Sequence, residues 1–175
     1  GKWYWEVKCA AISTGTWTYS NIGITALLRS SNAQYNHLGS ISEDFSYYAY
    51  NGHIMNNTGS SNTGTAYGNT YTLNDIIGVA LDLDNNKLYF HKNGTYQNSG
   101  DPTSGSTGTG AKSLTSGYLY TFFFGAYNGN GSANFGSPPY SISSGNADAN
   151  GFGNFEYSVP SGYYALNTTN LNTYG

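Results

Sequence analysis

Hydrophobic residues occupy every second position from residue 79 to residue 83 and again at residues 88 and 90. The two runs flank the polar pair Asn85-Asn86, and Asn93-Gly94 follows the second run. Because successive side chains of a strand point to opposite faces, this pattern predicts a hairpin with a two-residue turn. A second reversal is expected at Asn93-Gly94, since Asn and Gly tolerate positive φ. The predicted cross-strand pairs are Leu83 with Leu88 and Leu81 with Phe90.

Patterns of this kind recur along the chain, whereas helical periodicity is nearly absent. Only residues 25–32 offer a turn or two of helix, and we treat them as a loop. We expect strands at residues 2–11, 20–25, 46–51, 76–83, 87–92, 118–127 and 131–135. Segments rich in Gly, Ser, Thr and Asn are expected to be surface loops, at residues 56–68, 99–110 and 141–150. Short strands at this spacing are typical of an all-β sandwich.

The segment 118–127 differs from the other predicted strands because it is apolar on both faces. This predicts a central strand that is covered on both sides. The residues that we expect in the core are Val79, Leu81, Leu83, Leu88, Phe90 and the run Phe122 to Phe124.

Charged residues make up only 9% of the chain, against a usual share of about 25%, and aromatic residues make up 17%. The net charge is −3 and the six basic residues are scattered, so no positive stripe is present for nucleic acid. No apolar run approaches the roughly 20 residues of a membrane span, so we expect no membrane insertion. Cys9 is the only cysteine and lies in an alternating strand, which predicts a buried thiol.

Several motifs of the chain occur together in one known family. Residues 75–82 read Asp-x-Ile-Gly-Val-x-Leu-Asp and residues 90–94 read Phe-x-Lys-Asn-Gly, which resembles the SPRY signature. Matching pieces occur in the expected order at Gly1–Val7, Ile22–Ile24, Tyr48–Gly52 and Ala133–Gly136. The resemblance implies a concanavalin-like β-sandwich of two antiparallel sheets over residues 1–140.

The segment from residue 152 to residue 171 resembles a tail that follows SPRY modules in bacteriophage and prophage structural proteins. We therefore expect residues 141–175 to be an extension that packs on the rim of the sandwich or links to a neighbouring module. The tail and the uncharged surface together predict a bacteriophage protein.

Catalytic and metal-binding patterns are not evident. A retaining glycosidase needs two carboxylates about 5 to 5.5 Å apart, and Glu6, Glu43 and Glu156 lack the spacing that supplies them from one strand. Asp82 and Asp84 lie on one strand face, but we expect Asp84 to pair with Lys87 across the turn. The three histidines lack ligand spacing, and the Asp82 segment lacks the Gly and Glu of a calcium loop. We expect no cofactor, no metal and no enzymatic activity.

The resemblance implies recognition of a partner through loops at one end of the sandwich. Aromatic rings beside amide side chains suit such a site because ordering them costs little entropy. The candidate residues are Trp17, Tyr19, Tyr50, Asn51, Tyr127 and Asn128. At Trp17 or Tyr127, we expect replacement by Ala to weaken binding by about 1 to 3 kcal/mol.

We expect a non-catalytic module of a bacteriophage virion, in a tail fibre, an appendage or a capsid decoration. Its expected partners are a protein or glycan on the host surface or other virion proteins, and a homo-oligomer is compatible with the sequence. Two alternatives remain open at this point. One is a lectin-like module or glycan-active enzyme of concanavalin-like fold, and the other is a cellular SPRY adaptor that binds peptides.

Overall fold

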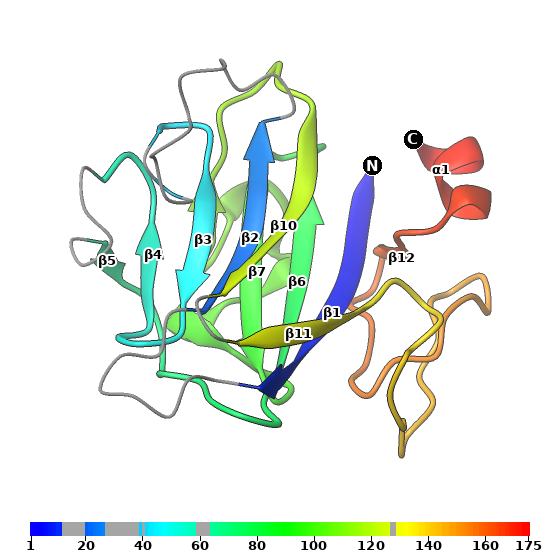
Figure 1. Ribbon diagram of the computed structural model, residues 1–175. Coiled ribbons are helices and arrows are strands. Elements are labelled where there is room, and N and C mark those ends of the chain that lie inside the picture. Colours follow the sequence, from blue (N-terminus) through cyan, green and yellow to red (C-terminus); the bar gives the residue numbers. More distant parts are fainter. Residues whose placement is uncertain (12–19, 27–38, 40, 59–63, 127–128) are drawn as a thin grey trace. The chain divides into compact units, whose positions relative to one another are not determined.

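The computed structural model describes residues 1–11, 20–26, 39, 41–58, 64–126 and 129–175. The chain divides into two units, which are described separately. Residues 1–10, 74–114 and 131–175 form the first unit, and residues 11–73 and 115–130 form the second. Each unit contains one sheet, and the described helices are short (Figure 1). The all-β class is thereby confirmed, and two sheets with few helices fit the expected sandwich.

The sheet of the first unit has the order β11-β1-β6-β7-β8, with β12 paired to β1 and β9 paired to β7. Its long strands match the predicted ranges closely because alternation is strongest there. Their bounds are β1 Lys2–Ala11, β6 Ile76–Asp82, β7 Lys87–Lys92 and β11 Asn130–Asn134. The short strands were not predicted, and they are β8 Thr95–Tyr96, β9 Lys112–Ser113 and β12 Tyr164–Ala165.

Both faces of this sheet are buried at its centre. The register places Trp5 beside Val79 and Val79 beside Phe90, and all three side chains are buried. On the opposite face, the next row contains Tyr4 and Tyr89, which are also buried. Antiparallel pairing between aromatic and β-branched side chains stabilises such rows. The strands therefore have covered positions on both of their faces.

The hairpin of β6 and β7 exists, but its predicted register is wrong by two residues. The observed pairs are Leu81 with Leu88 and Val79 with Phe90, and residues 83–86 form a four-residue turn. Asn85 donates its backbone N–H to the side chain of Asp82 at 2.9 Å, and this bond closes the longer turn. Leu83 consequently lies in the turn and is only partly buried, whereas the other four predicted core residues of the hairpin are buried.

The second unit contains a five-stranded sheet of order β10-β2-β3-β4-β5. Its bounds are β2 Ser20–Ala26, β3 Phe45–Tyr48, β4 His53–Met55, β5 Thr65–Ala66 and β10 Tyr120–Ala126. The prediction that β10 is a central strand is wrong, because β10 ends the described sheet and pairs there with β2. Phe122, Phe123 and Phe124 are accordingly half-buried.

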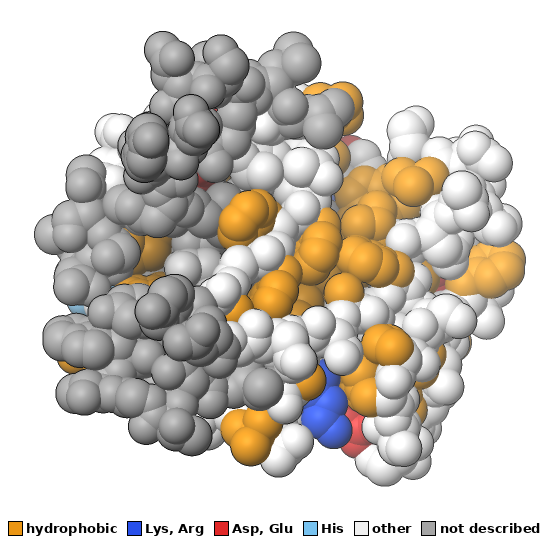
Figure 2. Space-filling model, viewed as in Figure 1, with side chains coloured by type: hydrophobic (Ala, Val, Ile, Leu, Met, Phe, Trp, Pro, Cys, Tyr) orange, Lys and Arg blue, Asp and Glu red, His pale blue; other side chains and the backbone are white. Residues whose placement is uncertain are grey.

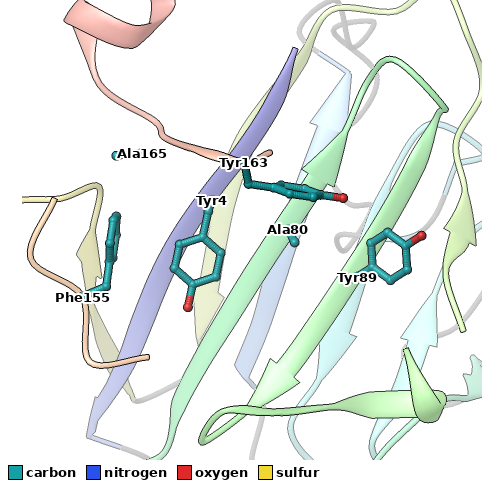
Figure 3. Close-up of a cluster of buried hydrophobic side chains, with 6 residues drawn as sticks. All are labelled: Tyr4, Ala80, Tyr89, Phe155, Tyr163 and Ala165. Carbon is teal, nitrogen blue, oxygen red and sulfur yellow. The ribbon is translucent and has the colours of Figure 1, made fainter. Parts of the chain in front are cut away.

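The segment 141–175 belongs to the first unit. Phe155, Tyr163 and Ala165 are buried in one cluster with side chains of β1, β6 and β7 (Figure 3). Strand β12 pairs with β1 in parallel, which departs from the purely antiparallel sheets that we expected. Because the first unit contains residues on both sides of residue 140, a domain boundary there stays a prediction.

Helical structure is slightly more extensive than expected. The helix α1 spans Thr168–Tyr174, and the side chain of Asn167 caps it by accepting the N–H of Asn170 at 2.9 Å. Two 3₁₀ segments are also present: η3 Pro102–Thr107 lies in the predicted loop 99–110, and η2 Gln97–Ser99 ends where that loop begins. The side-chain caps of α1 and η3 stabilise short helical turns without any hydrophobic periodicity, which explains why the pattern did not predict these two.

Candidate functional site

The structure describes two of the six predicted binding residues. Tyr50 and Asn51 lie in the turn between β3 and β4 of the second unit. Trp17, Tyr19, Tyr127 and Asn128 lie outside the described residues. A common site for all six therefore stays a prediction.

Tyr50 presents an exposed ring on a firmly held turn. Its side chain is 38% exposed, and its ring lies 6.2 Å from the ring of Tyr48. Gly52 donates its N–H to the carbonyl of Tyr48 at 3.0 Å and accepts the N–H of Gly68 at 2.9 Å. At Gly52, φ is +71°, and an added Cβ would lie 2.0 Å from the carbonyl oxygen of Gly68, so only Gly fits. A ring on such a turn loses little entropy when a partner binds it.

Asn51 has a structural contact in the same turn. Its Oδ1 accepts the backbone N–H of His53 at 3.0 Å, as is typical of an Asx turn. This leaves Tyr50 as the better candidate for contact with a partner.

A buried polar network in the first unit was not predicted from the sequence. His91 accepts the N–H of Gly94 on Nδ1 at 3.1 Å, so its Nε2 carries the proton that faces the hydroxyl of Tyr4 at 2.7 Å. Tyr4 in turn donates to Glu6 Oε1 at 3.0 Å. The carboxylate also accepts the N–H of Tyr157 at 2.8 Å. His91 therefore donates to Tyr4 and Tyr4 donates to Glu6, whose carboxylate also accepts from the backbone of the C-terminal segment.

Burial controls the protonation of this network. It lowers the pKa of His91 to about 3 and raises the pKa of the Tyr4 hydroxyl well above its usual range. Burial also raises the pKa of Glu6, although backbone amides and the Tyr4 hydroxyl donate to it and offset part of that effect. The imidazole is thus neutral at physiological pH.

The network has no route to a substrate, because Tyr4 and Glu6 are 0% exposed and His91 is 1% exposed. Its contacts instead fix the backbone of the C-terminal segment. One part of the network could be read from the sequence, because Tyr4 and Glu6 are two residues apart and therefore lie on one face of β1. The structure adds that Gly78 pairs with both Glu6 and His91. An added Cβ at Gly78 would lie 1.8 Å from Nε2 of His91, so this Gly makes space for the ring.

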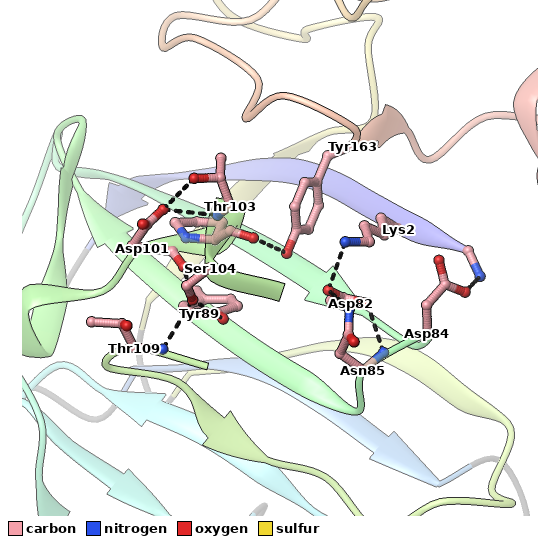
Figure 4. Close-up of polar contacts among 12 residues, drawn as sticks. Lys2, Asp82, Asp84, Asn85, Tyr89, Asp101, Thr103, Ser104, Thr109 and Tyr163 are labelled. Carbon is pink, nitrogen blue, oxygen red and sulfur yellow. Dashed lines mark hydrogen bonds and ion pairs between the residues drawn. The ribbon is translucent and has the colours of Figure 1, made fainter. Parts of the chain in front are cut away.

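Near the β6–β7 turn, the pairing of Asp84 with Lys87 that we predicted is wrong (Figure 4). Asp84 pairs with the amino group of Gly1 at 2.7 Å, and Lys87 donates to Ser113 at 3.0 Å. Both partners are distant in the sequence from the turn, so the local pattern around Asp84 and Lys87 could not predict them.

The neighbouring carboxylate of Asp82 is fully buried and pairs with Lys2 at 3.0 Å. Burial raises its pKa, but hydrogen bonds from Asn85 and Lys2 outweigh that effect and hold the pKa below its usual range. Its oxygens are therefore engaged in holding the turn.

Within the ranges that the structure describes, no three or more His, Cys, Asp and Glu side chains gather as a metal site. No helix in the described ranges is long and apolar enough to cross a membrane. The predicted burial of Cys9 is confirmed, and burial raises the pKa of its thiol to about 12.

The described surface is largely uncharged. Figure 2 shows one face on which polar and hydrophobic side chains predominate and charged ones are few. Large hydrophobic side chains that are exposed on the described residues are Tyr50, Leu73, Tyr118, Leu119, Phe152, Leu171 and Tyr174. Contacts with a partner here would depend on aromatic packing and hydrogen bonds more than on charge.

The sequence matches the SPRY domain family over residues 2–138. The chain belongs to the SPRY domain family. It is also 37% identical over 95 residues to Ran-binding protein 9 of Danio rerio, which covers 54% of this chain and 14% of that protein. Similarity is 36% to the Ran-binding proteins 9/10 homolog of Drosophila melanogaster over 94 residues, with 54% of this chain and 9% of the relative covered. Human Ran-binding protein 9 is 36% identical over 95 residues, which is 54% of this chain and 12% of the relative.

These matches correct the predicted source and setting. The relatives are cellular proteins of fish, fly and human, so the predicted bacteriophage virion module and its virion location are wrong. Virion and glycan partners likewise find no support in the family or in these relatives. The SPRY family itself was predicted correctly from the motifs. The error came from the resemblance of residues 152–171 and from the uncharged surface, neither of which restricts the kind of organism.

Proposed function

We propose that this SPRY domain is a non-catalytic module that binds a protein partner within a cellular protein. The observation that carries the proposal is the family match, which extends from residue 2 to residue 138. Ran-binding proteins 9 and 10 are similar to this chain over 95 residues, and their names attribute Ran binding to the whole proteins. Because that part is at most 14% of their length, we assign protein binding to the chain without assigning Ran.

The contacts of the acidic residues support a non-catalytic role. Glu6 accepts hydrogen bonds inside the first unit, where it is fully buried. Glu43 accepts the hydroxyl of Ser42 at 2.6 Å, and Glu156 accepts the N–H of Ser143 at 2.7 Å. A general acid or base must reach the proton that it transfers, and these carboxylates are engaged with the fold.

Tyr50 is the residue that we propose as an anchor for the partner. Tyrosine is enriched among residues that dominate binding energy, because its ring buries area and its hydroxyl forms hydrogen bonds. The turn that carries Tyr50 is fixed by hydrogen bonds at Gly52, so the ring is preorganised. Exposure alone does not distinguish it from Tyr118, which is 47% exposed in the same unit.

The test selects binders from a displayed library of random peptides and measures them by calorimetry with the wild-type chain. We expect Tyr50→Ala to lower the affinity for a selected peptide by about tenfold, which corresponds to about 1.4 kcal/mol of binding free energy, as loss of an aromatic anchor does. Tyr118→Ala is the matched control and should leave the affinity within about twofold. Equal losses in the two variants would contradict the assignment of Tyr50. A library that yields no binder would contradict peptide recognition itself.

A further inference from the structure

The C-terminal residues 141–175, which we term the cover segment, are organised by contacts of their own. Asp148 accepts the N–H groups of Asn150, Phe152 and Ala165 at 2.9, 3.0 and 2.9 Å. It also accepts the side-chain amide of Asn170 at 2.8 Å. A single buried carboxylate thus draws together distant parts of the cover segment.

The cover segment contacts the rest of the first unit through aromatic packing, backbone pairing and hydrogen bonds. Phe155 packs edge-on against Tyr4, with ring centroids 5.1 Å apart and an interplanar angle of 80°. Tyr163 donates its hydroxyl to the carbonyl of Pro102 at 3.1 Å (Figure 4). Leu166 donates its N–H to the carbonyl of Tyr4 at 3.3 Å, next to the two-residue pairing of β12 with β1. These contacts resemble those of a bound peptide: an aromatic anchor, a short β-pairing and a hydroxyl bond.

Glu6 is the most specific of these points. Its carboxylate accepts the consecutive N–H groups of Glu156 at 3.0 Å and Tyr157 at 2.8 Å. Its other donors are the hydroxyl of Tyr4 and the amide of Asn134, at 3.0 and 3.5 Å. Two of these four donors come from the backbone of the cover segment, so any extended segment in that position can supply them.

The face beneath the cover segment combines a cluster of buried rings with a carboxylate that accepts backbone N–H groups. Figure 3 shows Tyr4 of β1 and Tyr89 of β7 on this face, with Phe155 and Tyr163 of the cover segment beside them. A buried carboxylate is costly unless hydrogen bonds satisfy it, and two of the bonds that satisfy Glu6 come from the backbone of the cover segment. Bonds to backbone N–H groups do not depend on the side chains of the segment, as in the recognition of extended peptides.

We propose that this face of β1, β6 and β7 is a peptide-binding face whose occupant is the chain's own cover segment. The cover segment is a removable ligand, and a second copy of the same segment takes its place when it is released. This face lies in the first unit and involves no residue of the Tyr50 turn. The inference therefore stands or fails independently of the proposed function.

The test uses the full chain with a protease site inserted after Ser141, which is exposed. After cleavage, a fluorescent peptide of residues 141–175 is added, and its anisotropy reports exchange with the resident segment. We expect saturable binding by the cut chain, competition by unlabelled peptide, and no binding by the uncut chain at the same concentration. Far-UV dichroism after cleavage should retain the strand signal.

Glu6→Gln is the diagnostic variant. Glutamine offers one acceptor oxygen instead of two, so an N–H of the peptide loses its partner. We expect the peptide affinity to fall by about tenfold or more. Glu43→Gln is the matched control because its carboxylate bonds only the neighbouring hydroxyl of Ser42 among its described partners, and it should leave the affinity unchanged.

Three results would each overturn the inference. The first is a cut chain that keeps its strands but does not exchange the peptide, because the segment is then a permanent part of the fold. The second is loss of the strand signal on cleavage, which makes the segment part of the folding core. The third is an affinity that Glu6→Gln leaves unchanged or that both variants lower equally. Tyr50→Ala should not alter peptide exchange, which separates this test from that of the proposed function.

Discussion

Replacing Gly78 by Ala should destabilise the chain by about 1 to 5 kcal/mol, although Ala is normally more stable than Gly inside a strand. The added Cβ would lie 1.8 Å from Nε2 of His91 and 2.3 Å from its Cδ2, so the ring must move. Movement breaks the contact of His91 with Tyr4 at 2.7 Å and strains its bond from Gly94 at 3.1 Å. Overpacking typically costs about 1 to 3 kcal/mol, and a buried group that loses its partner costs a further 1 to 3 kcal/mol. The gain from removing Gly from a strand is only about 0.5 to 1 kcal/mol.

The assay is urea unfolding followed by tryptophan fluorescence, to which Trp3 and Trp5, buried in the same unit, contribute. For a small protein the urea slope is about 1 to 3 kcal/mol per molar, so the midpoint should fall by roughly 2 M. The control is the same substitution in a His91→Ala background, where the ring is absent. There, Gly78→Ala should be neutral or stabilise by about 0.5 kcal/mol. An equal loss in both backgrounds would refute the argument that Gly78 is required by the His91 ring.

Two further predictions concern titratable groups. Cys9 should not react with a thiol reagent in the native chain and should react fully in urea, because burial raises its pKa to about 12; rapid native labelling would contradict this. His91 should make stability depend on pH: its pKa is about 3 in the folded chain against the usual 6.5, so acidification protonates the unfolded chain first. The free energy of unfolding should therefore fall from pH 6.5 towards pH 3, by at most about 1.4 kcal/mol per pH unit from this group. The raised pKa of Glu6 makes the free energy of unfolding rise on acidification, which opposes the effect of His91. The contribution of His91 is therefore measured as the difference in pH dependence between the wild type and His91→Ala. An identical pH dependence in the two proteins would exclude a contribution of His91.

Local sequence patterns were sufficient to predict the family, the all-β class and the bounds of most long strands. Alternation and turn residues are local properties, so β1, β6 and β7 were predicted within a residue of their observed ends. The predicted strand 46–51 is too long at its C-terminal end, because β3 ends at Tyr48 and Tyr50 lies on the turn that follows. The source of the protein was not predictable, since a tail rich in aromatic and amide residues does not identify an organism.

Tertiary structure alone decided the register of the hairpin, the place of β10 and the polar network. A two-residue and a four-residue turn fit the same alternation, and the choice depended on the side chain of Asp82. Whether an apolar strand is central or at an edge depends on which strands pair with it, which alternation does not encode. Tyr4 and His91 are 87 residues apart, and the fold brings them within hydrogen-bond distance across three strands. A sequence pattern records which face a side chain occupies, but the partners of a buried polar group are set by the long-range packing that must satisfy it.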